Sequence, residues 1–372
     1  MQELTDLTRD LVAIPSHEGE AAAGDYIEDW LHEHTDAEVT RDDAGADEGR
    51  GGNVIARRGN TERDSPTLAL VGHHDVVPPD ETQVDDEGNY VVYEEDGRLY
   101  GRGSADMKGA DAAAMLAFRD ADLGEAEYEL VFACFVGEEV GGVGARYAIE
   151  QGFAPDHALV AEGSTGYASA EGVLDVALAH KGRRGSTITA RGEAAHASEP
   201  HLGANAVYRA CDAVDVVREL DWPTIEVAGE ELSGSVCVTE IDGGSAWNVV
   251  PETCEVTVDE RTVPGERADL AQVENIEGVQ WAVDQDLPPM RCEDDEFADA
   301  ALAAVRAVQS GRGQHVTKPH ATDAGWLAQA GTECVVCGPS ETGEAHTKTE
   351  SVSLDVLATC YEAYRELAET WG

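Results

Sequence analysis

Basic residues are scarce in this chain of 372 residues. Lys and Arg total 25, of which only four are Lys, whereas Asp and Glu total 75, so the formal net charge is −50. Such a balance excludes a basic surface for nucleic acid and a polybasic anchor for anionic membranes. The hydrophobic content of 42% is too high for a disordered acidic chain. We therefore expect a folded protein that binds neither nucleic acid nor membrane.

Long apolar runs and a cysteine framework are also missing. No run reaches the roughly 18 residues of a membrane span, and the first ten residues hold no apolar core of a secretory signal. The eight Cys are scattered, and the one CxxC, at 334–337, has no second CxxC with which to form a zinc site. The sequence therefore predicts a soluble, cytoplasmic protein whose cysteines are structural.

The excess of acids over bases predicts a halophilic protein, adapted to molar salt. At about 1 M ionic strength the screening length falls to about 3 Å, so the surplus negative charges repel one another only weakly. An ordinary acidic cytoplasmic protein is the alternative.

Alternating strand and helix patterns indicate an α/β fold. Short apolar strand candidates at 67–71, 130–136 and 158–161 alternate with a helix candidate of small residues at 108–118. Strands that alternate with helices in this way predict a sheet that is covered by helices on both faces.

The chain is long enough for two domains, and its texture changes near residue 181. Strand and helix patterns then follow in the order β-α-β-β-α, at 185–191, 204–220, 235–241, 255–260 and from Ala268 onward. This order is typical of a small α+β domain. We expect an inserted domain at 181–288 and a first domain made of 1–180 and 289–372.

His and carboxylate residues follow the strand candidates directly. They are His73, His74 and Asp75 after the first strand, Glu138 and Glu139 after the second, and Glu162 after the third. Ligands bind at the carboxyl ends of strands in open α/β sheets, and these side chains suit zinc-like metals. Because alternate residues of extended backbone share a face, Asp75 is placed to fix the tautomer of a metal-bound His73. A solvated loop is the alternative for any single Glu in so acidic a chain.

Glu138 and Glu139 are neighbours, so their side chains face oppositely. One of them can therefore bind metal while the other acts as general base on a water molecule.

A glycine-rich segment at 101–106 raises the alternative of a nucleotide-dependent enzyme. The dinucleotide fingerprint fails there because Asp106 stands where its last Gly is required, and no clear strand precedes the segment with a ribose-binding acid downstream. A tight turn that presents Asp106 at the start of a helix is the better interpretation.

Several motifs together resemble the M20 metallopeptidase family, which includes acetylornithine deacetylase, succinyl-diaminopimelate desuccinylase, aminoacylase and glutamate carboxypeptidase. The matching segments are GHHDVVP at 72–78, DGRLYGRGSADMKG at 96–109, GEEVGGVGA at 137–145, EGST at 162–165, GEAAHASEP at 192–200, GANA at 203–206, NVVPE at 248–252, DER at 259–261, TDA at 322–324, and GPS, AHT and Glu350 within 338–350. The resemblance implies a catalytic domain with a central mixed sheet flanked by helices. It also implies an inserted, ferredoxin-like domain that serves as lid or dimerisation domain.

The resemblance further implies a site for two divalent metal ions, expected to be zinc, with cobalt or manganese as alternatives. The implied ligands are His73, Asp106, Glu139, Glu162 and His346. Asp106 would bridge the two ions. His73 and Glu162 would complete one site, and Glu139 and His346 would complete the other.

The same resemblance implies the roles of residues around the metals. Glu138 would be the general base and Asp75 the orienting carboxylate. His196, on the inserted domain, would hold the developing oxyanion. Asn248 and Arg261 would contact substrate, and the bidentate fork of Arg261 suits a carboxylate. In many relatives the histidine that corresponds to His196 reaches the metals of the neighbouring subunit. We therefore expect a homodimer formed through the inserted domain.

The implied reaction is hydrolysis of a linear amide by metal-activated water. The expected substrate is an N-acyl amino acid of arginine or lysine biosynthesis, either N-acetylornithine or N-succinyl-diaminopimelate; the segment 181–186 resembles the desuccinylases. A dipeptidase or carboxypeptidase of the same family, acting on a short peptide, is one alternative. A non-catalytic metal-binding relative is another. Departures from the family pattern at Gly137, Gly163 and His320, and after His346, touch no implied ligand and bear on specificity.

Overall fold

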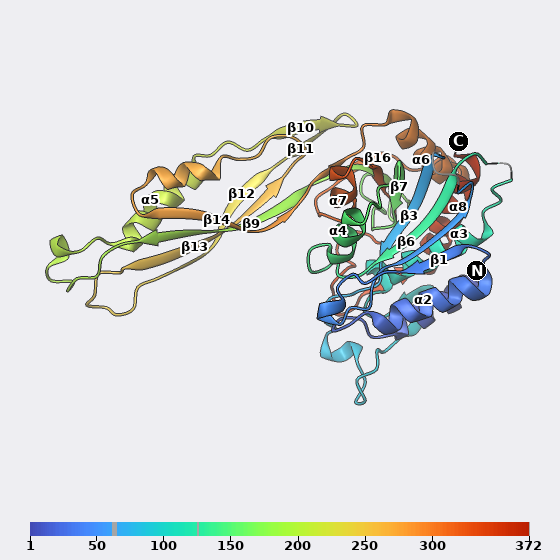
Figure 1. The fold of residues 1–372 in the computed structure, drawn as a ribbon, viewed down its shortest axis with the longest axis horizontal. Helices are drawn as coiled ribbons and strands as arrows, with labels where there is room; N and C mark the ends of the chain where they lie inside the picture. Colours follow the sequence, from blue (N-terminus) through green and yellow to red (C-terminus); the bar gives the residue numbers. More distant parts are fainter. Residues whose placement is uncertain (62–64, 125, 372) are drawn as a thin grey trace. The chain divides into compact units, whose positions relative to one another are not determined.

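The computed structural model describes residues 1–61, 65–124 and 126–371. They form two compact units (Figure 1). The first unit consists of Met1–Ala179, Met290–Lys318 and Thr322–Gly372, and the second of His180–Pro289 and Pro319–Ala321. The segment predicted as an insertion therefore falls within the second unit, which also takes in 319–321.

The first unit is built on a nine-stranded mixed sheet. Its strands run in the order β1 (Glu38–Arg41), β2 (Val54–Gly59), β6 (Glu129–Phe135), β3 (Thr67–His73), β7 (His157–Val160), β17 (Glu333–Val336), β8 (Val176–His180) and β15 (Met290–Arg291), with β16 (His315–Lys318) paired to β8. The central neighbours β6, β3, β7 and β17 are parallel, whereas the pairs β1–β2, β2–β6 and β17–β8 are antiparallel. The expected mixed sheet is confirmed.

Helices pack on both faces of this sheet. They are α1 (Gln2–Ala13), α2 (Ala21–His34), α3 (Gly109–Asp120), α4 (Val143–Glu150), α6 (Asp295–Val308), α7 (Ala324–Gln329) and α8 (Leu354–Thr370). Helices α1, α3, α8 and α6 contact one another in that order, and α4 contacts α7. On the α4 and α7 side, Val71, Phe135 and Leu327 belong to one buried apolar cluster. Because both faces are covered, β3 and β6 are buried almost throughout and read as continuous apolar runs.

Shorter elements surround this core. They are the small sheet β18 (Ser351–Ser353), β5 (Arg98–Tyr100) and β4 (Tyr93–Glu95), and the helical turns η1 (Ala46–Glu48), η2 (Glu81–Gln83) and η3 (Ser104–Lys108). The turn η3 leads directly into α3, so the tight turn expected before this helix is present.

The second unit is a four-stranded antiparallel sheet covered by α5. Its strands run in the order β12 (Ser235–Gly243), β13 (Thr253–Thr262), β9 (Gly182–Arg191) and β14 (Val279–Leu287), and its other elements are α5 (Ala206–Arg218), η4 (Pro200–Leu202), η5 (Leu270–Asn275) and the hairpin β10 (Thr224–Val227) and β11 (Glu230–Ser233). This strand order, with α5 and η5 as the helical connections, is the ferredoxin-like arrangement. The side chain of Asn205 starts α5 by accepting the N–H groups of Val207 and Tyr208.

The expected second α-helix from Ala268 is not formed. The structure forms only the short 3-10 segment η5 there, because the chain turns after Asn275 into β14, a strand that the sequence pattern did not indicate.

No described helix combines the length and apolar character needed to cross a lipid bilayer. All eight cysteines lie in the described residues as thiols, and Cys334 and Cys337 are buried.

Candidate metal centre

Three parallel strands end at the same edge of the first unit's sheet and bring predicted ligands there. His73 is the last residue of β3, Glu139 follows β6, and Glu162 follows β7. Because these strands are parallel neighbours, their carboxyl ends lie side by side. Asp106 comes from η3, just before α3, and His346 from the loop between β17 and β18.

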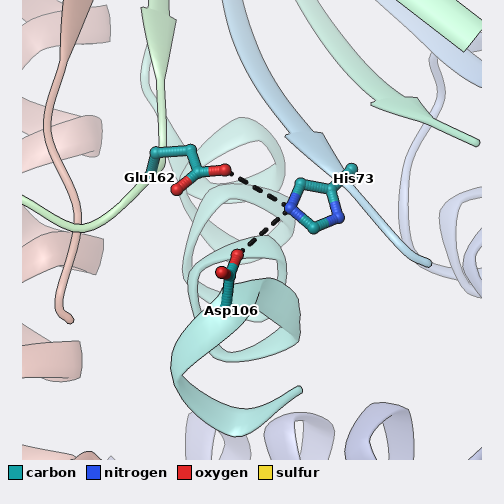
Figure 2. A group of neighbouring side chains, drawn as sticks. All are labelled: His73, Asp106 and Glu162. Carbon is teal, nitrogen blue, oxygen red and sulfur yellow. Dashed lines mark hydrogen bonds and ion pairs between the residues drawn. The ribbon is translucent and has the colours of Figure 1, made fainter. Parts of the chain in front are cut away.

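His73, Asp106 and Glu162 form the first candidate ligand group (Figure 2). Nε2 of His73 lies 3.2 Å from Oδ1 of Asp106 and 3.3 Å from Oε1 of Glu162. Figure 2 shows both carboxylates pointing toward the same imidazole nitrogen. His73 and Glu162 are buried, so the group is largely withdrawn from water.

Asp106, Glu139 and His346 form the second group. Nε2 of His346 lies 2.9 Å from Oε1 of Glu139 and 3.1 Å from Oδ2 of Asp106. Asp106 therefore offers one carboxylate oxygen to each group, and it is the member that the two groups share. The backbone of His346 has φ 62°, in the left-handed region, so the loop holds this side chain at a cost on the order of 1–3 kcal/mol.

The donor set fits divalent metal ions. Imidazole and carboxylate are the ligands that zinc and similar metals use, and in each group the ligand atoms lie within 4.8 Å of one another. The carboxylates also attract positive charge. Hydrogen bonds to Asp106 and Glu139 raise the pKa of His346 to about 10. Burial alone would raise the pKa of Asp106, but the two imidazoles lower it. A divalent ion in each group would supply that positive charge in place of a proton.

Asp75 connects the loops that follow β3 and β6. Its Oδ1 lies 3.3 Å from Nδ1 of His73, which is the contact expected from the sequence. The same carboxylate accepts the backbone N–H groups of Glu138 and Glu139 at 3.0 and 3.1 Å. Burial opposes ionisation, but His73, together with the two backbone N–H groups, outweighs burial and lowers the pKa of Asp75. Asp75 thus orients His73 and fixes the backbone of both glutamates.

Glu138 lies beside the two ligand groups and belongs to neither. Glu139 belongs to a candidate ligand group and Glu138 does not, which is compatible with the division of roles expected for this pair. Burial raises the pKa of Glu138 well above its usual range, and the carboxylates of Asp323 and Glu162 add to the rise.

His196 and Asn248 lie next to each other in the second unit. His196 forms a β-bridge with Val249, and the backbone N–H of Ala197 donates to the backbone oxygen of Asn248 at 2.9 Å. Nδ1 of His196 lies 2.7 Å from Oγ and 3.2 Å from the backbone N of Ser198. The residue is exposed.

Arg261, also in the second unit, is engaged by a carboxylate. Its Nε lies 2.8 Å from Oδ1 of Asp259, and Nε of Arg183 lies 2.8 Å from the other oxygen. Arg183 and Arg261 are cross-strand neighbours on β9 and β13. The predicted substrate-binding guanidinium is thus one of two that converge on Asp259.

The profile of peptidase family M20/M25/M40 matches residues 69–370. The chain belongs to this family. An acetylornithine deacetylase of Myxococcus xanthus is 30% identical over 336 residues, which cover 86% of this chain and 83% of that protein. A succinyl-diaminopimelate desuccinylase of Stutzerimonas stutzeri is 30% identical over 331 residues, covering 83% of this chain and 84% of that one.

The fold is shared with a solved structure. The crystal structure of aminopeptidase PepT from Bacillus cereus matches with a TM-score of 0.80 and 21% sequence identity, covering 99% of this chain and 98% of that one. The M20 chain described here is therefore a metallo-hydrolase of this fold.

Lys318, which the sequence analysis missed, contacts a member of the first candidate ligand group. Its Nζ lies 3.1 Å from Oε2 of Glu162, while Oε1 of Glu162 faces His73. Burial opposes the charge of Lys318, but Glu162 outweighs burial and raises the pKa of this lysine. The sequence signal that could have drawn attention to Lys318 is the rarity of lysine, because the chain has four lysines.

Glu350 and Asp323 were also missed, although both lie in matched motifs. Glu350 is buried and accepts the backbone N–H groups of Ala105 and Asp106. Asp323 is buried near the site, and burial raises its pKa to about 7. The sequence did not indicate that either residue lies near the ligand groups, because each belongs to a loop that is far along the chain from His73 and Asp106.

Proposed function

We propose that this chain hydrolyses the amide bond of an N-acyl amino acid with the help of two divalent ions. The observation that carries the proposal is the shared carboxylate of Asp106, whose two oxygens face the imidazoles of His73 and His346 separately. One carboxylate that faces a histidine on either side can offer an oxygen to each of two ions. Zinc is the proposed metal, with cobalt or manganese as alternatives.

The ligands proposed for the two ions are His73, Asp106 and Glu162 for one, and Asp106, Glu139 and His346 for the other. Bound ions would polarise the amide carbonyl and favour ionisation of the attacking water. Glu138 takes the proton of that water and returns it to the leaving amine. A raised pKa makes the ionised carboxylate of Glu138 a stronger base towards the proton of that water.

Residues of the second unit complete the proposed mechanism. His196 donates an imidazole N–H to the oxyanion that develops on the carbonyl oxygen. Nε2 is the nitrogen proposed for this role, since Nδ1 contacts Ser198. Asn248 and Arg261 bind the substrate, Arg261 by exchanging Asp259 for a substrate carboxylate.

The substrate class is proposed from the two relatives at 30% identity, whose names are acetylornithine deacetylase and succinyl-diaminopimelate desuccinylase. The test is a hydrolysis screen of N-acetylornithine, N-succinyl-diaminopimelate and a dipeptide panel, with Zn²⁺, Co²⁺ or Mn²⁺ in molar KCl. Release of acetate or succinate supports the proposal and separates the two substrates. Cleavage of dipeptides alone would instead favour the peptidase alternative. No hydrolysis by protein shown to hold two ions would overturn both.

We also propose a homodimer formed through the second unit. Strand β12 is an edge of its sheet, with no further strand paired along its outer side in the described part of the chain. Beside it a groove is lined by apolar side chains of α5 and β12, and the side chains of Trp222 and Ile241 are 45% and 53% exposed. A second copy related by a two-fold axis could pair with this edge and bury these side chains.

A further inference from the structure

Glu350 connects the C-terminal part of the first unit to the turn that carries Asp106. It is 1% exposed and immediately precedes β18. Its Oε1 accepts the backbone N–H of Ala105 at 3.1 Å and that of Asp106 at 3.2 Å. Its backbone oxygen accepts the N–H of Gly101 at 3.2 Å, so the residue is itself fixed at this place.

The second carboxylate oxygen of Glu350 is paired with Arg102. Arg102 is 3% exposed, so the ion pair is buried. Both oxygens of Glu350 therefore hold the same segment, one through two consecutive N–H groups and the other through a guanidinium. Burial raises the pKa of Glu350 to about 7, against the lowering effect of Arg102 and the two N–H groups. The contacts of both carboxylate oxygens restrict how the segment can move.

We propose that Glu350 is a positioning residue that fixes the shared ligand Asp106 and thereby sets the affinity of both ion sites together. Asp106 has a short side chain, so the position of its carboxylate follows closely from the position of its backbone. Its Oδ1 and Oδ2 face different histidines, and any shift of the backbone misplaces both oxygens at once. Lys318, in contrast, contacts Glu162, a member of the first group alone.

This inference rests on the proposed two-ion site, and the experiment is arranged to separate the two. Metal-free protein in molar KCl is titrated with Zn²⁺ in competition with a chromophoric chelator, which gives the affinity of each binding step. Two binding steps in the unaltered protein are required by the proposed function. Fewer than two steps would overturn the proposed function, and with it this inference.

The informative variant is Glu350→Gln, which keeps the size of the side chain but replaces one oxygen by an NH₂ group. That NH₂ group is a hydrogen-bond donor, and it must face either the guanidinium of Arg102 or the two backbone N–H groups, which are donors too. We expect both zinc-binding steps to weaken by about tenfold or more, the lower range for loss of a group that orients metal ligands. Two normal steps in the unaltered protein and unchanged affinities in Glu350→Gln would overturn the role of Glu350 alone.

A matched control exists in the second unit. Glu260 is buried, pairs with Arg184 and accepts the backbone N–H of Ala268, so its contacts resemble those of Glu350, with one backbone N–H group in place of two. Glu260→Gln removes a similar buried ion pair, and zinc affinity should stay within about threefold of the original, because Glu260 does not contact the ligand groups. Thermal unfolding of both metal-free variants shows how far each is destabilised. A loss of affinity in Glu260→Gln as large as that in Glu350→Gln would mean that destabilisation alone explains the effect.

A second variant decides the matter if Glu350→Gln fails to fold. Arg102→Lys leaves Glu350 and its two backbone hydrogen bonds in place but replaces the guanidinium by a smaller cation. Both zinc-binding steps should weaken in the same direction. A change confined to one step, or none, would contradict the positioning role.

Discussion

Asp106 is the residue on which both ligand groups depend, because one of its oxygens lies 3.2 Å from Nε2 of His73 and the other 3.1 Å from Nε2 of His346. Asp106→Ala should therefore lose both ions, whereas His346→Ala should lose mainly one. Elemental analysis of protein freed of loosely bound metal measures the two contents. Equal metal contents in the two variants would argue against a shared ligand.

Glu138 and Glu139 differ in what they contact, although they are neighbours in the sequence. Glu139 lies 2.9 Å from His346, and Glu138 belongs to neither ligand group. We expect Glu138→Gln to lower kcat by at least about a hundredfold, the lower range for loss of a general base. Its metal content should stay that of the original protein, while Glu139→Gln should lose metal. If Glu138→Gln is the variant that loses an ion, the two roles are exchanged.

At the scale of elements, the site depends on how the loops after β3 and β6 are joined. Asp75, after β3, accepts the N–H groups of Glu138 and Glu139, after β6. An amide in place of the carboxylate can accept only with its oxygen, so one N–H loses its partner. Asp75→Asn should therefore lower kcat/KM by about 10- to 100-fold, as is typical for partners of metal ligands.

A similar carboxylate at the opposite end of β3 supplies the control for this prediction. Oδ2 of Asp156 accepts both the backbone N–H and the hydroxyl of Thr67, and so joins the starts of β3 and β7. Asp156→Asn should leave kcat/KM within about threefold of the original, because this end of the sheet carries none of the ligand groups. Equal losses in the two variants would show that general loosening of the strands, rather than the site, limits activity.

The strands that carry the site could be predicted because they are buried on both faces. β3, β6 and β7 appear in the sequence as apolar runs, each followed by a His or carboxylate. Edge and surface elements gave weaker patterns. β14 is an edge strand with mostly exposed or half-buried residues, so no clear alternation marked it.

Among the site residues, a contact between close sequence neighbours could be predicted, whereas contacts between distant segments could not. The proximity of Asp75 to His73 follows from two positions of extended backbone and could be predicted locally. The contacts of Lys318 and Glu350 could not, because each joins segments more than 150 residues apart. Such pairs are set by the strand order of the whole sheet, which local patterns do not determine.

The charge of the whole molecule leads to a prediction about salt. With 75 acidic and 25 basic residues, repulsion opposes the compact state, and the screening length grows from about 3 Å at 1 M salt to about 10 Å at 0.1 M. Fold and activity should therefore decline as KCl falls below about 1 M. Circular dichroism and hydrolysis along a KCl series measure both. A protein that stays fully folded in dilute buffer without divalent ions would contradict adaptation to salt.

The assembly of the molecule can be tested through His196, which lies in the second unit, whereas both ligand groups lie in the first. If His196 serves the partner's metals, mixing inactive His196→Ala with inactive Glu138→Gln rebuilds one intact site in each heterodimer. For random exchange of equal amounts, half of the dimers are mixed and each has one of two sites intact, so activity should recover to about a quarter of the original. Light scattering establishes that dimers are present, and exchange of labelled subunits establishes mixing. Proven exchange without recovered activity would mean that His196 acts within its own subunit, or outside catalysis.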